Sequence, residues 1–187
     1  MKTEVIVVAA GAGKRLNAKV PKALVLLKGK PLIAYCLKVF ENHPGIDGVV
    51  IVGAGGFLSQ FIRLTRSFKK VRAVVAGGLL RSDSVKCGLK ALSPDTDIVL
   101  VHDAARPFVE KDMISRLFAA LKKNKAAIVG VPVKVRWKSG SLRRPIGFQN
   151  RAAAIQCCLA TAGRAYQRSN SRRWRGKTLM RSRVFWE

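Results

Sequence analysis

Acidic residues are scarce in this sequence. Its 187 residues include 36 Lys and Arg but only 10 Asp and Glu, which gives a formal net charge of +26. The four cysteines are too few and too irregularly spaced to predict a disulfide framework or a zinc site. No apolar run approaches the ~20 residues that a membrane-spanning helix needs, and the N-terminus has no apolar stretch long enough for a secretory signal. We therefore expect a cytoplasmic protein without membrane association.

The length and the hydrophobic content predict a folded domain. A chain of 187 residues fits one domain, on a prior of roughly 100–200 residues for each. A hydrophobic content of 49% excludes a disordered polar chain. The high positive charge is typical of proteins that bind nucleic acid, so its distribution along the chain decides how it is interpreted.

The charge is unevenly distributed. Residues 1–134 contain 23 Lys and Arg and 9 Asp and Glu, a net charge of +14. Residues 135–187 contain 13 Lys and Arg and one acid, a net charge of +12, together with all three tryptophans. The density of net charge thus roughly doubles after Lys134. This change in composition predicts a domain over residues 1–134 and a different, basic tail over residues 135–187.

Short Val/Ile/Leu runs alternate with amphipathic stretches in the first 134 residues. The predicted strands cover residues 4–9, 48–52, 71–75, 98–101 and 127–131. One predicted helix begins near Pro31 and stops at residues 42–45, and a separate amphipathic stretch follows the loop at residues 53–56 and ends at Arg66. Two further helices are predicted over residues 81–92 and 112–123. This alternation predicts an α/β fold with a mostly parallel sheet and helices on both faces. Because ligands bind beyond the carboxyl ends of such strands, the loops at residues 10–21, 77–84 and 102–107 should meet at one site.

A loop of small residues follows the first predicted strand. It consists of Ala9, Ala10, Gly11, Ala12 and Gly13. Small residues let backbone N–H groups approach a phosphate, and the cations of Lys14 and Arg15 would balance its charge. The loop matches neither a Walker loop nor a dinucleotide fingerprint, so an ordinary strand-to-helix turn stays open as an alternative. Lys22 lies on a segment stiffened by Pro21 and, with Arg15, favours binding of a polyphosphate whose charge grows during transfer.

The second loop leads from Gly77 and Gly78 into a predicted helix. Ser82 or Ser84 either caps this helix or uses its hydroxyl to read the edge of a nucleobase. Both interpretations stay open on the sequence alone.

The third loop follows the strand that ends near Val101. Asp103 is well placed there to hold Mg²⁺, which binds phosphate oxygens through only one or two carboxylates. The alternative is a structural ion pair between Asp103 and Arg106. His102 is interpreted as a packed neighbour of the acid. Together, the three loops indicate a site for a nucleoside triphosphate and Mg²⁺, and hence a nucleotidyl or phosphoryl transferase.

At these motifs the chain resembles a known family. The motifs are Ala9-Ala10-Gly11-Ala12-Gly13-Lys14-Arg15, Pro21-Lys22, Gly77-Gly78 with Arg81 and Ser84-Val85, and Val101-His102-Asp103-Ala104-Ala105-Arg106-Pro107. Their order and spacing resemble the 2-C-methyl-D-erythritol 4-phosphate cytidylyltransferase (IspD) family over about residues 1–134. The resemblance implies a Rossmann-like nucleotidyltransferase fold, a cytoplasmic homodimer and transfer of CMP from CTP to the sugar phosphate, with CDP-methylerythritol and pyrophosphate as products.

The resemblance also implies roles for single residues. Arg15 and Lys22 would stabilise the α-phosphate in the transition state, and Asp103 would coordinate Mg²⁺. The nucleotide-binding residues would be Ala9, Ala10, Gly11, Ala12, Gly13, Gly78, Arg81, Ser84 and Ala104. The sequence departs from the family pattern with Leu16 in place of Met, Ala23 in place of Gln, and the apolar Leu79-Leu80 pair where a polar residue is common.

The family motifs stop after Lys134. Val135 and Arg136 replace an Asp-Thr pair, and the later motifs of the family are missing. We hypothesise that the residues from about Val135 are out of frame or form a disordered basic tail. In the family this region builds the dimer and completes the acceptor site, so we assign no acceptor-binding residue there and do not carry the homodimer over to this chain.

Three other interpretations stay open. The same nucleotide motifs would serve a cytidylyltransferase for another polyol phosphate, such as ribitol 5-phosphate. The +26 charge and the Arg/Trp-containing tail suit an RNA-binding protein, although the motifs predict a pocket rather than a basic aromatic surface. A non-functional gene remnant is the third.

Overall fold

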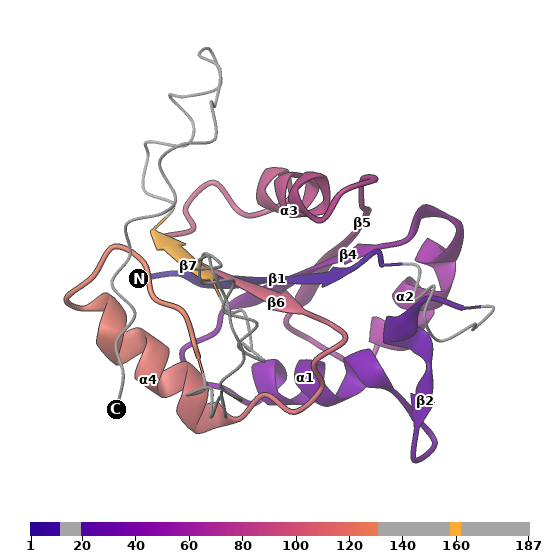
Figure 1. Ribbon diagram of the computed structural model, residues 1–187, viewed down its shortest axis with the longest axis horizontal. Coiled ribbons are helices and arrows are strands. Elements are labelled where there is room, and N and C mark those ends of the chain that lie inside the picture. The colour runs from indigo at the N-terminus through magenta and orange to yellow at the C-terminus, as the bar shows by residue number, and fades with distance from the viewer. Residues whose placement is uncertain (12–19, 131–157, 162–187) are drawn as a thin grey trace, which may run out of the picture.

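A five-stranded sheet forms the centre of the molecule (Figure 1). The computed structural model describes residues 1–11, 20–130 and 158–161. In spatial order, the strands are β5 (Val71–Ala76), β4 (Gly48–Gly53), β1 (Thr3–Ala9), β6 (Ile98–Asp103) and β7 (Cys158–Thr161). The first four are mutually parallel, and β7 is antiparallel to β6. The predicted mostly parallel sheet is therefore confirmed.

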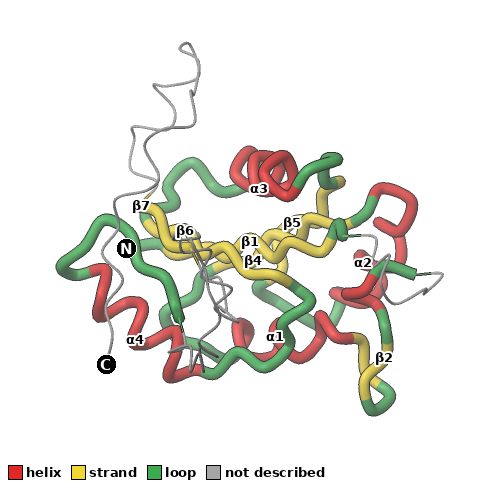
Figure 2. The backbone as a smooth tube through the Cα atoms, viewed as in Figure 1, coloured by secondary structure: helices red, strands yellow, loops and turns green. Residues whose placement is uncertain are grey.

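Helices cover both faces of this sheet (Figure 2). They are α1 (Leu32–Glu41), α2 (Leu58–Thr65), α3 (Arg81–Lys90) and α4 (Lys111–Leu121). The short elements are the 3-10 turns η2 (Lys22–Leu24) and η3 (Gly55–Phe57) and the hairpin strands β2 (Leu26–Leu27) and β3 (Lys30–Pro31). Helix α3 lies on one face, and α1 and α4 lie on the other (Figure 1). None of the helices in the described part of the chain has the length and apolarity needed to cross a bilayer.

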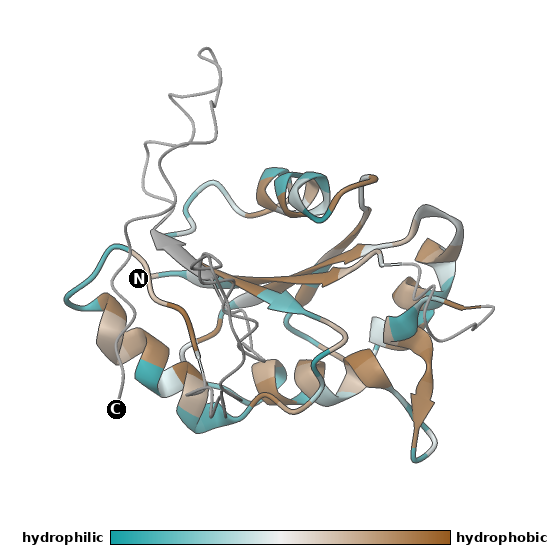
Figure 3. Ribbon diagram, in the orientation of Figure 1, coloured by the Kyte–Doolittle hydropathy of each residue, from teal (hydrophilic) through white to brown (hydrophobic). Residues whose placement is uncertain are grey.

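The two faces follow from the alternation of side chains along each strand. Val5 and Val7 of β1 point into the larger core, which contains residues of α1, α2 and α4. Ile6 points to the opposite face and packs in a smaller core with Val99 and residues of α3. Successive strand side chains point to opposite faces, so a continuous apolar run is what a strand covered on both faces requires. Figure 3 shows this apolar character along β1 and a polar carboxyl end on β6.

Gly88 allows α3 to lie very close to the sheet. A Cβ atom at this position would lie 2.5 Å from Cγ2 of Ile6 and 3.0 Å from Cγ2 of Val52. Real Cβ atoms do not approach other atoms so closely, so any larger residue would push α3 outwards. The glycine therefore fixes the height of α3 above the sheet and, with it, the position of Arg81 at the first turn of the helix.

A buried carboxylate lies at the end of the sheet opposite the three predicted loops. The side chain of Glu4 is fully buried. It accepts hydrogen bonds from the backbone N–H of Ser93 at 2.7 Å, from the Ser93 hydroxyl at 3.0 Å and from the Thr96 hydroxyl at 2.5 Å. The guanidinium Nε of Arg72 lies 3.5 Å from the same carboxylate. These contacts tie the start of β1 to the segment that precedes β6.

One predicted strand is wrong over its described residues. Residues 127–130 contain a single bridge position rather than a strand. The edge of β6 on which such a strand would pair is hydrogen-bonded to β7 instead, with Ile98 opposite Thr161 and Val101 opposite Cys158. The last residue of the prediction, Val131, lies outside the described residues.

Candidate active site

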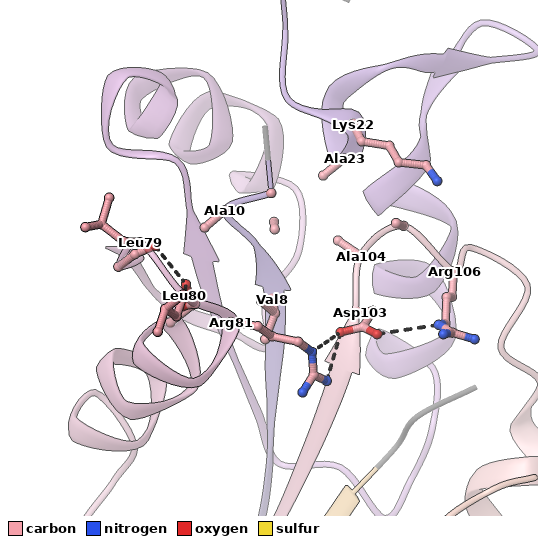
Figure 4. Close-up of a pocket in the computed structure, with 15 residues that line it drawn as sticks. Val8, Ala10, Lys22, Ala23, Leu79, Leu80, Arg81, Asp103, Ala104 and Arg106 are labelled. Carbon is pink, nitrogen blue, oxygen red and sulfur yellow. Dashed lines mark hydrogen bonds and ion pairs between the residues drawn. The ribbon is translucent and has the colours of Figure 1, made fainter. Parts of the chain in front are cut away.

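A cavity of about 500 Å³ opens at the carboxyl ends of β1 and β6 (Figure 4). This volume lies within the range of roughly 300–1,000 Å³ that is usual for small-molecule sites. Four described chain segments form its walls: the end of β1, the start of η2, the loop that leads into α3, and the turn after β6. The described parts of the loops predicted to meet at one site therefore do meet there, whereas residues 12–19 of the first loop lie outside the described residues.

Most of the predicted site residues line this cavity. They are Ala9, Ala10, Gly11, Lys22, Gly78, Arg81, Ser84, Asp103 and Ala104. Ala12, Gly13 and Arg15 lie outside the described residues. The structure brings the lining residues together, and the functions assigned to them stay predictions.

Asp103 lies between two arginines at the end of β6. Its Oδ1 accepts a hydrogen bond from Nε of Arg81 at 3.0 Å, and Nη2 of Arg81 lies 3.0 Å from the same oxygen. Its Oδ2 lies 3.5 Å from Nε of Arg106. The predicted alternative of an Asp103–Arg106 ion pair is thus present, and the shorter contact with Arg81 was not foreseen (Figure 4).

Arg106 lines the cavity, a position that was not predicted from the sequence. The sequence predicts it only as the structural partner of Asp103. Its place near the cavity could have been predicted, because it follows Asp103 by three residues in a tight turn. Such a turn brings both side chains to the same end of the sheet. Its backbone N–H donates to the carbonyl of Asp103 at 2.9 Å, which closes this turn.

Lys22 is the third cationic residue that lines the cavity, after Arg81 and Arg106. It begins the short turn η2, and the N–H of Leu24 donates to the carbonyl of Pro21 at 2.8 Å. Buried Ala23 anchors the turn, and the Lys22 side chain lies above the turn that carries Asp103 (Figure 4). Within the described ranges, the cavity is lined by three cations and one acid, so it attracts anions.

The serines that precede and follow Asp83 do not cap α3. The helix begins at Arg81 after Leu80 as N-cap, so both serines lie inside its first turns. Asp83 is the third residue of the helix, and its carboxylate accepts a hydrogen bond from the backbone N–H of Leu80 at 3.4 Å. The hydroxyl of Ser84 is buried and lies 3.3 Å from the carbonyl of Leu80. The capping interpretation of Ser82 or Ser84 is therefore wrong, and nucleobase recognition by Ser84 stays a prediction.

His102 is packed beneath the site, as interpreted from the sequence. It is fully buried, its ring lies edge-on to Phe40, and its Nε2 lies 3.0 Å from the carbonyl of Arg106. Burial lowers the pKa of His102 to about 4, because the charged imidazolium is poorly solvated there. The ring is therefore neutral at pH 7, and its Nε2–H is suited to donate to the Arg106 carbonyl and hold the turn in place.

We expect stability to fall in acid because of His102. An unfolded histidine has a pKa near 6.5, so between about pH 6.5 and 4 the unfolded chain binds more protons than the folded one. The free energy of unfolding should therefore drop by roughly 3 kcal/mol over this range. Urea unfolding at a series of pH values measures it. His102→Gln, which does not titrate, should have a flatter profile, and an equally steep profile in this variant would contradict the assignment.

Asp103 fits a magnesium ion that is held together with phosphates. It is the single carboxylate among the residues that line the described cavity. The described ranges contain no group of three or more His, Cys, Asp or Glu side chains suited to a resident metal. Mg²⁺ in phosphate-transfer sites typically binds one or two carboxylates and takes its other ligands from water and substrate phosphates. The donor set therefore suits an ion that enters with a triphosphate.

A mostly parallel α/β sheet with an anion-attracting cavity at its carboxyl edge is typical of the Rossmann-like class, in which nucleotide-binding proteins are common. The model of the family 2-C-methyl-D-erythritol 4-phosphate cytidylyltransferase matches residues 3–147. The chain belongs to this family. The match ends 13 residues beyond Lys134, and the predicted domain boundary at that residue stays a prediction.

Similar proteins agree with this assignment. The chain is 46% identical over 136 residues to 2-C-methyl-D-erythritol 4-phosphate cytidylyltransferase of Alkaliphilus oremlandii, covering 71% of this chain and 58% of that one. It is 39% identical over 135 residues to the protein of the same name from Geobacter metallireducens, covering 69% and 58%. The chain thus spans less than two thirds of the length of these relatives.

Solved structures share the fold. The Francisella tularensis 2-C-methyl-D-erythritol 4-phosphate cytidylyltransferase superposes with a TM-score of 0.67 at 26% identity, covering 91% of this chain and 79% of that one. The 4-diphosphocytidyl-2C-methyl-D-erythritol synthase of Anaerococcus prevotii gives a TM-score of 0.72 at 22% identity, covering 92% and 77%. The predicted Rossmann-like nucleotidyltransferase fold is confirmed.

Proposed function

We propose that this chain transfers CMP from CTP to 2-C-methyl-D-erythritol 4-phosphate, with CDP-methylerythritol and pyrophosphate as products. The proposal rests on one observation in a chain of this family: the described start of the small-residue loop, Lys22 and Asp103 line the same cavity. A cytoplasmic location and a dependence on Mg²⁺ are parts of the same proposal. The homodimer of the family is not part of this proposal.

The reaction needs charge stabilisation and positioning more than covalent chemistry. The acceptor phosphate attacks the α-phosphate of CTP in line, and pyrophosphate leaves with the bonding electrons. Negative charge then grows on the α-phosphate oxygens, where the ammonium of Lys22 and the predicted contribution of Arg15 would stabilise it. Ala9, Ala10 and Gly11 carry little side-chain bulk, so their backbone leaves room for a triphosphate to approach.

Asp103 would hold the magnesium ion. Bound there, Mg²⁺ would neutralise phosphate charge and orient the triphosphate. Positioning of this kind supplies a large share of the rate in transfers between bound partners. Arg81 and Arg106 keep the carboxylate at the cavity wall.

Calorimetry with CTP and Mg²⁺ tests nucleotide binding directly. We expect saturable CTP binding that requires the divalent ion, with much weaker heats for ATP and GTP. No heat with CTP, together with salt-sensitive binding of a single-stranded RNA oligonucleotide, would overturn the proposal in favour of RNA binding.

Turnover with different acceptors tests the second substrate. We expect CTP-dependent pyrophosphate release with 2-C-methyl-D-erythritol 4-phosphate and not with ribitol 5-phosphate. Release with ribitol 5-phosphate alone would replace the proposed acceptor with the other polyol phosphate. Normal CTP binding without turnover on either acceptor would overturn transferase activity for this chain and support the gene-remnant alternative.

A further inference from the structure

The Asp103 carboxylate is held by guanidinium groups on both oxygens. Arg81 presents two nitrogens to Oδ1, each at 3.0 Å, whereas Arg106 presents Nε to Oδ2 at the longer distance of 3.5 Å. These are charge-assisted contacts, and the two on Oδ1 are the shorter ones. Among the described residues, Arg81 is therefore the closest cationic partner of the carboxylate on which the proposed magnesium site depends.

A divalent cation and Arg81 compete for the same oxygen. Mg²⁺ binds carboxylate oxygens at ~2.0–2.1 Å and demands regular octahedral geometry. A guanidinium placed 3.0 Å from that oxygen uses its lone pairs and repels the incoming charge. The first turn of α3, where Arg81 lies, adds the partial positive charge of a helix N-terminus. Asp103 with these neighbours is a poor site for a metal ion alone.

A nucleoside triphosphate changes this balance. Its phosphates bring about four negative charges into a cavity lined by Lys22, Arg81 and Arg106. Its oxygens offer additional ligands to the metal and new partners to a guanidinium. The Arg81 side chain is 44% exposed, so it has room to turn from Asp103 to another partner. By contrast, the packing of Gly88 against Ile6 keeps the backbone of α3 in place.

We propose that Arg81 is a positioning residue that keeps divalent cations off Asp103 until a nucleoside triphosphate enters. The triphosphate and the metal then bind together, with the Asp103–Arg81 pair exchanged for contacts of both groups with the metal–nucleotide complex. This inference rests on the proposed function of the cavity. It makes Arg81 a determinant of the order in which metal and nucleotide bind.

Titration with Mn²⁺, followed by the loss of its free-ion electron paramagnetic resonance signal, tests the inference without measuring activity. Without nucleotide, Arg81→Gln should bind Mn²⁺ at least about fivefold more tightly than the unmodified chain, as expected for loss of a competing ion pair. Arg106→Gln should give a smaller gain because its contact is longer. Arg81→Lys keeps the charge without the second donor and should fall between Arg81→Gln and the unmodified chain.

Lys86→Gln is the matched control. Lys86 lies on the same helix and pairs with Asp83 rather than Asp103. Its removal lowers the charge of α3 by the same amount, but Mn²⁺ affinity should change by less than about twofold. In Arg81→Gln/Asp103→Asn the gain should vanish. A gain equal to that of Lys86→Gln, or a gain that survives in the double variant, would overturn the inference.

Addition of CTP separates this inference from the proposed function. At saturating CTP, after subtraction of the Mn²⁺ that the same CTP binds without protein, the unmodified chain should no longer bind Mn²⁺ more weakly than Arg81→Gln, because the nucleotide then occupies Arg81. If CTP fails to promote Mn²⁺ binding in any variant, the proposed function is overturned. If CTP promotes it in the unmodified chain while Arg81→Gln gains nothing without nucleotide, only the role of Arg81 is overturned.

Discussion

Replacement of Lys22 by alanine should lower the rate of CMP transfer by about 10²–10³-fold, the effect typical of removing one group that stabilises transition-state charge. Pro21 and the η2 turn fix the backbone of Lys22 at the wall of the cavity before substrate arrives. The reduction should appear mainly in kcat, with a smaller change in the affinity for CTP. Steady-state rates and calorimetry on the same preparation measure the two effects.

Lys38→Ala is the control for Lys22→Ala. Lys38 is an exposed lysine on α1 and does not line the cavity, so its loss changes the net charge equally without removing a site contact. Its kcat should stay within about twofold of the unmodified value. If Lys22→Ala weakened CTP binding as much as it lowered kcat/KM, Lys22 would be a ground-state ligand and not a transition-state one. Unchanged kcat and unchanged affinity would remove it from the site altogether.

Replacement of Glu4 by alanine should cost about 3 kcal/mol of unfolding free energy, since loss of one member of a buried charged network is strongly destabilising. The N–H of Ser93 and the hydroxyl of Thr96 would lose their acceptor in a region closed to water. The variant leaves the cavity at the other end of β1 untouched. Urea-induced unfolding at pH 7, followed by circular dichroism, measures the difference.

Asp95→Asn provides the comparison for Glu4→Ala. Asp95 also lies near the start of β6 and pairs with Lys2 at 2.7 Å, but it is exposed to solvent. Its replacement should leave the unfolding midpoint unchanged within error. Equal losses in the two variants would contradict the assigned importance of burial, as would an unfolding midpoint for Glu4→Ala that matched the unmodified chain.

The central strands β4, β1 and β6 were predictable because their hydrophobic runs are uninterrupted. In β1, the run from Val5 to Val8 has no polar residue, which leaves a strand covered on both faces as the simplest interpretation. The failed strand at residues 127–131 has similar composition, but its pairing depends on which segment reaches the edge of β6. Local composition does not show which of two distant segments pairs with that edge, so strand β7 was not predicted.

The site was predictable at the level of loops and less so at the level of side-chain partners. Strand ends and glycines located the three loops, because parallel strands place their carboxyl ends at one edge of the sheet. The Arg81–Asp103 contact joins residues 22 apart in sequence and depends on how closely Gly88 lets α3 approach the sheet. The buried Glu4 was also unforeseen, since its partners Ser93 and Thr96 lie about 90 residues away.

The edge strand β7 has a consequence for synthesis of the protein. Strand β6 is complete at Asp103, but its antiparallel neighbour ends at Thr161, 58 residues later. At ~5–20 residues per second, a ribosome needs roughly 3–12 s to add that stretch. During this interval the outer backbone groups of β6 have no β7 to pair with. Neighbouring nascent chains on one messenger RNA would present the same unpaired edge, which favours pairing between copies before each chain closes its own sheet.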